Sequence, residues 1–303
     1  KMTIPQFDVR NFVFDINSKK LSYALKISSE KFIDEKSLII SNVSYEIISE
    51  TSLGDLNNSL IPSKIEASIF NNRLGFEVDY YERNTRDLLL DVEVPGTSGF
   101  ATQLKNIGNL KNKGIEFTIN STNIQTKNFR WTTSLNFGAN KNRITNLGGQ
   151  VLGTDVNKAK EGASLGIFFT KEFAGADPAN GDAIYFLNTP KADGTLDKTT
   201  TNDYNAAADV IVGNPNPDFI YGFGNTFTYK GIDLDVLLQG IQGNDVYNGG
   251  GQYMSASGSN GFDNQTIDQL AAWDKPGDIT MVPEARLFYG NGVNPSSRYI
   301  SDG

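Results

Sequence analysis

Apolar and polar side chains alternate through many segments of this 303-residue chain. In residues 219–229 the odd positions are mostly aromatic, and the even positions are mostly glycine or threonine. Successive side chains of a β-strand point to opposite faces, so this period gives each strand one apolar and one small polar face. The same alternation recurs at residues 76–80, 115–120, 131–140 and 232–239, while helical periodicity is hard to find. The pattern predicts an all-β, antiparallel protein.

The connections between these segments alternate in length. Short runs with the composition of hairpin turns are Asn71-Asn72, Gln125–Asn128 and Lys230-Gly231. Long runs rich in Gly, Asn, Asp, Pro and Thr are Asp91–Asn112, Leu147–Pro217 and the stretch from Asn248 onward. Compact soluble domains rarely carry such long connections. Short turns on one side and long loops on the other are typical of an outer-membrane β-barrel, so we expect a transmembrane barrel portion with long extracellular loops.

The composition excludes several classes of protein. Lys plus Arg number 27 and Asp plus Glu number 35, and the net charge of −8 argues against a nucleic-acid partner. The chain has no Cys and no His, which removes thiolate and histidine catalysis as well as the zinc sites they build. Asp233 and Asp235 share one strand face. We interpret them as residues that line a lumen rather than as a catalytic pair of carboxylates. We therefore do not expect an enzyme.

Periodicity alone leaves an alternative open. A soluble β-sandwich also alternates, with its apolar face packed on a second sheet, and such a protein would be a soluble β-rich glycan-binding module. The difference between short and long connections favours the barrel. Residues 1–60 are an uncertain β-rich segment, interpreted as earlier barrel strands: Phe7–Ile16 and Leu21–Ser28 suggest a hairpin, and Ser37–Ser49 another strand.

Several ordered motifs between Lys64 and Gly303 resemble the SusC/RagA family of TonB-dependent outer-membrane transporters of Bacteroidota. The motifs lie at family-like spacing in Asn71–Asp87, Asn106–Glu116, Phe129–Phe137, Gly162–Tyr185, Val212–Pro217 and Ser297–Gly303. The resemblance implies a barrel of about 22 strands. It makes residues 61–303 part of the C-terminal half of that barrel, with residues 147–217 as a large extracellular loop. Both ends of the chain look cut, and the family's plug and TonB-contacting segment would then lie outside it.

The resemblance also implies a function and partners. The whole protein would import nutrients, either glycan oligosaccharides or peptides, through the outer membrane of a Gram-negative cell. A SusD-like lipoprotein would cover the extracellular side, the TonB complex would act through the missing N-terminal region, and the strands would contact outer-membrane lipid.

Aromatic residues in the long loops are the candidates for substrate contact, because sugars stack their apolar faces on aromatic rings. These residues are Phe168, Phe169, Tyr185, Phe186, Tyr204 and Tyr253. The alternative is that the rings pack the loops together or meet a partner. Asp177, Asn180 and Asp182 form an acidic cluster that resembles a weak calcium loop, for which an Asx-stabilised turn is the simpler interpretation. No other cofactor is expected.

The alternation also assigns faces. Phe117, Leu135, Phe223 and Phe227 are predicted to meet lipid, and Thr118, Asn136, Gly224 and Thr226 to face the lumen. Trp131, Tyr80, Tyr221, Tyr229 and Tyr247 are predicted to be aromatic residues at the membrane interface.

Overall fold

The computed structural model describes residues 12–15, 20–27, 40–49, 58–100, 102–153, 155–261 and 263–303. The chain forms two compact units. The sheet unit comprises residues 1–150 and 217–242, and the loop unit comprises residues 151–216 and 243–303. Within the described residues, no helix is both long enough and apolar enough to cross a membrane.

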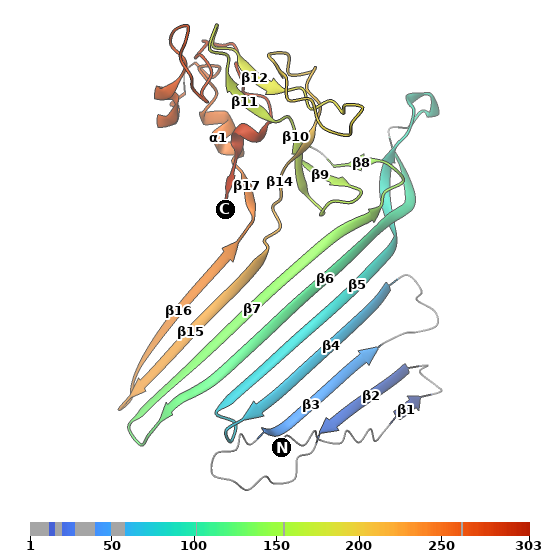
Figure 1. The fold of residues 1–303 in the computed structure, drawn as a ribbon, viewed down its shortest axis with the longest axis vertical. Coiled ribbons are helices and arrows are strands. Elements are labelled where there is room, and N and C mark those ends of the chain that lie inside the picture. The colour runs from blue at the N-terminus through green and yellow to red at the C-terminus, as the bar shows by residue number, and fades with distance from the viewer. Residues whose placement is uncertain are drawn as a thin grey trace. The chain divides into compact units, whose positions relative to one another are not determined.

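Nine strands form one antiparallel sheet in the sheet unit (Figure 1). Their order is β1-β2-β3-β4-β5-β6-β7-β15-β16, so neighbours in the sheet are successive strands of this unit. The predicted all-β, antiparallel fold is confirmed. The strands are β1 (Phe12–Asp15), β2 (Lys20–Ile27), β3 (Ile40–Ser49), β4 (Asn58–Ile69), β5 (Leu74–Glu93), β6 (Thr102–Gln125), β7 (Phe129–Asn146), β15 (Phe219–Tyr229) and β16 (Ile232–Gln242).

The strand register confirms the predicted grouping of side chains. Residues directly opposite in an antiparallel pair share a face. Phe223 lies opposite Leu135 on one side and Leu238 on the other, whereas Thr226 lies opposite Thr132 and Asp235. We call the side of Phe223 the apolar face and the side of Thr226 the polar face.

Aromatic rings stack across neighbouring strands on the apolar face. The ring centroids of Phe117 and Phe137 are 4.9 Å apart, and those of Trp131 and Phe227 are 5.5 Å apart. The Tyr221 ring covers Gly240 on β16, where a Cβ atom would overlap it. A glycine thus permits a cross-strand aromatic contact that a larger residue would block.

Two expected boundaries are wrong. Asp91–Asn112 was expected to be a loop, but β5 and β6 continue through most of it, and Leu88 to Glu93 pair with Gly108 to Thr102. The connection is short and contains one 3-10 helix, Gly96–Ser98. Tyr247 was predicted to be a strand aromatic residue at the membrane interface, but β16 ends at Gln242 and Tyr247 lies on a short strand of the loop unit.

The loop unit contains nine short strands (Figure 1). Three small sheets have the orders β14-β10-β9-β8, β11-β12-β13 and β17-β18. Short helices occupy part of its C-terminal half. The elements are β8 (Val151–Leu152), β9 (Asn157–Lys160), β10 (Ile167–Thr170), β11 (Phe173–Ala176), β12 (Ala183–Phe186), β13 (Thr200–Thr201), β14 (Val210–Gly213), β17 (Asp245–Tyr247), β18 (Ile300–Asp302), α1 (Gly249–Met254) and the 3-10 helices η2 (Ile267–Ala271) and η3 (Ser297–Tyr299).

A buried asparagine connects separate segments of the loop unit. The Oδ1 atom of Asn291 accepts a hydrogen bond from the backbone N–H of Ala183 at 2.8 Å. Its Nδ2 group donates to the carbonyls of Gly181 at 2.9 Å and Glu284 at 3.0 Å. One side chain therefore satisfies three backbone groups, whose loss of partners inside the protein would be costly.

We predict that Phe223→Arg destabilises the folded protein by about 2–4 kcal/mol, because it places a charge on the face that is predicted to meet lipid. Gly222→Arg is the matched control, since a Cβ atom there has no neighbour within 4 Å. Gly224 is a poorer control because its Cβ atom would lie 2.8 Å from the Ser134 hydroxyl. Urea titration of the full-length protein in lipid vesicles gives the free energies of unfolding. Equal losses for both variants would contradict the face assignment.

We predict that Asn291→Ala lowers the stability of the loop unit by about 3 kcal/mol, because three backbone groups lose their partner. Amide hydrogen exchange across residues 173–186 measures this change. Asn260→Ala is the control, since its Nδ2 group makes a single exposed hydrogen bond to the Tyr253 carbonyl at 2.9 Å. If both variants left exchange unchanged, Asn291 would not be a stabilising connection.

Candidate functional site

Three of the six candidate aromatic residues lie in the interior of the loop unit. Phe168 is 4% exposed and Tyr185 is 2% exposed. Tyr185 packs edge-on against Phe173 and Tyr204, with ring centroids 5.7 and 5.2 Å apart, and burial raises the pKa of its phenol. The Tyr204 hydroxyl donates to the Pro295 carbonyl at 2.8 Å. These rings pack the loop unit, and their predicted contact with substrate is untested.

Of the other three candidate rings, Phe169 and Phe186 are partly buried and Tyr253 is exposed. Phe169 lies beneath the Lys160 ammonium at 4.5 Å, and Phe186 beneath that of Lys198 at 5.1 Å. Tyr253 is exposed, and its hydroxyl donates to a carboxylate oxygen of Asp263. Open rings beside charged and polar groups can stack on a ligand while their neighbours bind its polar groups. Phe169, Phe186 and Tyr253 are therefore the members of the set that best fit the predicted role.

The acidic cluster has the geometry of a stabilised turn. The Asp177 carboxylate accepts the backbone N–H of Ala179 at 2.8 Å, and Asn180 Oδ1 accepts that of Asp182 at 3.0 Å. The Asp182 carboxylate pairs with Arg286 at 2.7 Å. Burial alone would raise the pKa of Asp182, but hydrogen bonds from Asn202, Arg286 and Asn180 outweigh it and lower the pKa. Calcium binding remains a prediction, which these internal partners do not favour.

A partly buried arginine holds several segments of the loop unit together. The Arg298 guanidinium lies over the rings of Phe173 and Tyr299, 5.7 and 5.4 Å from their centroids. It donates to the Gly292 carbonyl at 3.2 Å and to the Ser257 hydroxyl at 3.3 Å. These contacts fix the positions of β11 and η3 relative to the chain around residues 257 and 292.

Sequence reasoning missed an exposed apolar surface of the loop unit. Ile267 and Leu270 on η2 are 83% and 87% exposed, and Ile279 and Met281 are also exposed. We call these four residues the apolar loop surface. Its two segments are joined by the Thr280 hydroxyl, which donates to the Ala271 carbonyl at 2.6 Å, and by the bridge between Ala272 and Val282. Scattered aliphatic residues in a polar stretch showed no period, so the sequence offered little signal for this surface.

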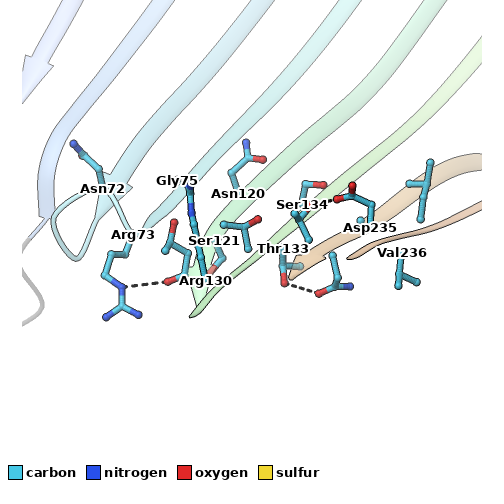
Figure 2. A pocket seen from close by; sticks show the side chains of 16 residues that line it. Asn72, Arg73, Gly75, Asn120, Ser121, Arg130, Thr133, Ser134, Asp235 and Val236 are labelled. Atoms are coloured by element: carbon cyan, nitrogen blue, oxygen red, sulfur yellow. Dashed lines mark hydrogen bonds between the residues drawn. The ribbon is translucent and has the colours of Figure 1, made fainter. Parts of the chain in front are cut away.

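A pocket near the short turns of the sheet unit is lined by residues from both faces of the strands. Its volume is about 480 Å³, and residues from β5, β6, β7, β15 and β16 line it. Asn120, Ser134 and Asp235 lie on one side of the strands, and Thr133 and Val236 lie on the other (Figure 2). The Asp235 carboxylate accepts a hydrogen bond from the Thr226 hydroxyl at 2.6 Å. The small polar residues of the lining that lie on the polar face, such as Ser134 and Thr226, fit a wet barrel wall.

Comparison with known proteins identifies relatives of the chain, although no family model matches it. TonB-dependent receptor P26 of Formosa agariphila is 34% identical over 252 residues, which are 79% of this chain and 25% of the relative. TonB-dependent receptor P3 of the same organism is 31% identical, with the same coverage. TonB-dependent receptor SusC of Bacteroides thetaiotaomicron is 28% identical over 60% of this chain and 19% of the relative. The chain thus spans about a quarter or less of each of these relatives.

Solved structures show the same fold. The RagAB peptide transporter superposes with a TM-score of 0.73 and 25% identity, covering 95% of this chain and 36% of that chain. The RagAB peptide importer in its open-open state gives the same TM-score over 93% of this chain. The names of the sequence relatives and the long antiparallel strands both agree with the outer-membrane barrel that the sequence predicted. The chain belongs to the SusC/RagA-like TonB-dependent transporters, which are β-barrel proteins of the outer membrane.

Proposed function

We propose that the full-length protein imports a nutrient across the outer membrane with a SusD-like lipoprotein over its extracellular side. The cargo would be an oligosaccharide or a peptide. Energy would come from the TonB complex acting on a part of the transporter outside this chain. This extends to the chain what the names of its relatives say of them: TonB-dependent receptors, SusC and a peptide transporter.

The observation that carries the lipoprotein proposal is the apolar loop surface. Four large apolar side chains point outward from a unit that has its own packed interior. Exposed apolar patches of this kind mark surfaces that contact another protein. In the described part of the chain, Leu287 and Phe288 add exposed apolar area nearby in the sequence, at 67% and 62% exposure.

Cargo contact is proposed for the open aromatic rings, Phe169, Phe186 and Tyr253. Their rings suit stacking on sugar rings or on apolar peptide side chains, and so do not separate the two cargo classes. Uptake of labelled oligosaccharides and of labelled peptides by cells that carry the transporter would separate them. Loss of one uptake activity in Tyr253→Ala, with the protein still in the membrane, would assign the class.

The soluble glycan-binding alternative is less consistent with the sheet. In a sandwich, the apolar face would be packed against a second sheet. Instead, Ile232, Leu234 and Leu238 on the apolar face are each more than half exposed. A row of exposed aliphatic side chains is unfavourable in water and suits lipid.

We predict that the double variant Ile267→Asp/Leu270→Asp weakens lipoprotein association by at least about tenfold. Charged side chains would replace apolar contacts that become buried when the lipoprotein binds. Co-purification of the SusD-like lipoprotein with the full-length transporter measures the association. Leu165→Asp is the control, because Leu165 is 51% exposed but lies outside the apolar loop surface. Undiminished co-purification of the double variant would remove this surface as the docking site. Uptake measured alongside tests import separately.

A further inference from the structure

A turn of the loop unit carries three consecutive large apolar side chains at its surface. Leu287, Phe288 and Tyr289 are 67%, 62% and 65% exposed. The backbone N–H of Tyr289 donates to the Arg286 carbonyl at 3.2 Å, which closes a β-turn with Leu287 and Phe288 as its two central residues. We call residues 286–289 the apolar turn. Contiguous apolar side chains are unfavourable in water, so this turn is suited to contact with another molecule.

Phe288 has a backbone conformation that usually belongs to glycine. Its φ angle is +57°. A β-turn with a positive φ at its second central residue normally has Gly or Asn there, because a Cβ atom is strained in the left-handed region. The exposed ring gains little from the fold in return for this strain. A large apolar residue at this position therefore indicates a contact outside the chain.

Contacts beneath the apolar turn hold the strained conformation in place. The Arg286 guanidinium forms ion pairs with Asp182 at 2.7 Å and with Glu284 at 2.6 Å. It also donates to the Asn180 carbonyl at 3.1 Å. Two carboxylates thus share one cation, so the base of the turn keeps negative charge.

A second segment supports the apolar turn from the side. The backbone N–H of Phe288 donates to the Gly258 carbonyl at 3.2 Å. Gly261 lies against the turn, since a Cβ atom there would be 2.5 Å from Leu287 Cδ1 and 2.9 Å from Phe288 Cε1. The turn is fixed before a partner arrives, which reduces the conformational entropy lost on binding.

Charge and shape limit which partner suits the apolar turn. The loop unit contains 16 Asp and Glu residues and 8 Lys and Arg residues, a net charge of −8, whereas the sheet unit contains 19 of each kind. Like charges make contact between two copies of the loop unit unfavourable, and a basic surface is complementary. A turn tip with a branched aliphatic side chain beside a ring fits an apolar pocket of a protein better than it fits a flat sugar ring.

We propose that the apolar turn inserts into an apolar pocket with a basic rim on the SusD-like lipoprotein. Leu287 and Phe288 fill the pocket, and the rim lies near the carboxylates of Asp182 and Glu284. This inference rests on the lipoprotein association proposed above and gives that association an anchor separate from the apolar loop surface. Aromatic residues buried in a partner's pocket supply much of the binding energy of an interface.

Co-purification of the lipoprotein with the full-length transporter tests the anchor. Phe288→Ala and Phe288→Gly should each weaken the association at least about tenfold, because both remove the ring. Phe288→Gly should not lower the stability of the loop unit, measured by amide hydrogen exchange, because glycine adopts a positive φ without strain. Phe100→Ala is the matched control, since Phe100 is 72% exposed but belongs to the sheet unit. Added salt should weaken the wild-type association, because it screens the basic rim from the acidic loop unit.

The wild-type protein separates this inference from the proposed function. A wild-type transporter that retained no lipoprotein would contradict the association itself, and the anchor with it. Retention by the wild type and equally by both Phe288 variants would overturn the anchor alone. Variants that lost cargo uptake but kept the lipoprotein would assign the apolar turn to cargo instead. Association that did not change with salt would contradict the basic rim.

Discussion

The sheet unit depends on the backbone hydrogen bond between neighbouring strands. Lipid offers no partner for an N–H or C=O group, so each must be paired within the protein. The ladders of β5, β6 and β7 meet this requirement over long distances: these strands have 20, 24 and 18 residues, compared with about 9–11 needed to cross the bilayer. With the backbone satisfied in this way, the side chains are free to specialise by face. Phe223 and Leu135 can meet lipid while Thr226 and Asp235 line a wet interior.

The loop unit is stabilised differently. Its strands are short, and side chains replace many of the partners that a long ladder supplies. Asn291 satisfies three backbone groups, and Arg298 lies between two aromatic rings. The side chains of Tyr185 and Phe168 are buried in the interior of the loop unit. Ile267 and Leu270 do not take part in this packing and stay exposed. They are therefore proposed to contact another protein.

Strand period two made the sheet predictable. It grouped Phe117, Leu135, Phe223 and Phe227 correctly, since alternation alone determines which side chains share a face. It could not show that Leu88 to Glu93 continue β5, because register shifts interrupt the pairing there. In the loop unit no period exists. The burial of Tyr185 and the exposure of Tyr253 depend on contacts between distant segments. The sequence therefore identified the set of aromatic residues but not which of them are buried.

The apolar face is assigned to lipid and the polar face to water. The chain contains no cysteine, so Phe223→Cys and Gly222→Cys each introduce a single thiol into it for spin labelling. In vesicles, we expect the label at position 223 to collide mainly with lipid-soluble oxygen and the label at position 222 to collide mainly with a water-soluble nickel complex. Reversed accessibilities, or equal ones at the two neighbouring positions, would contradict the assignment of the faces.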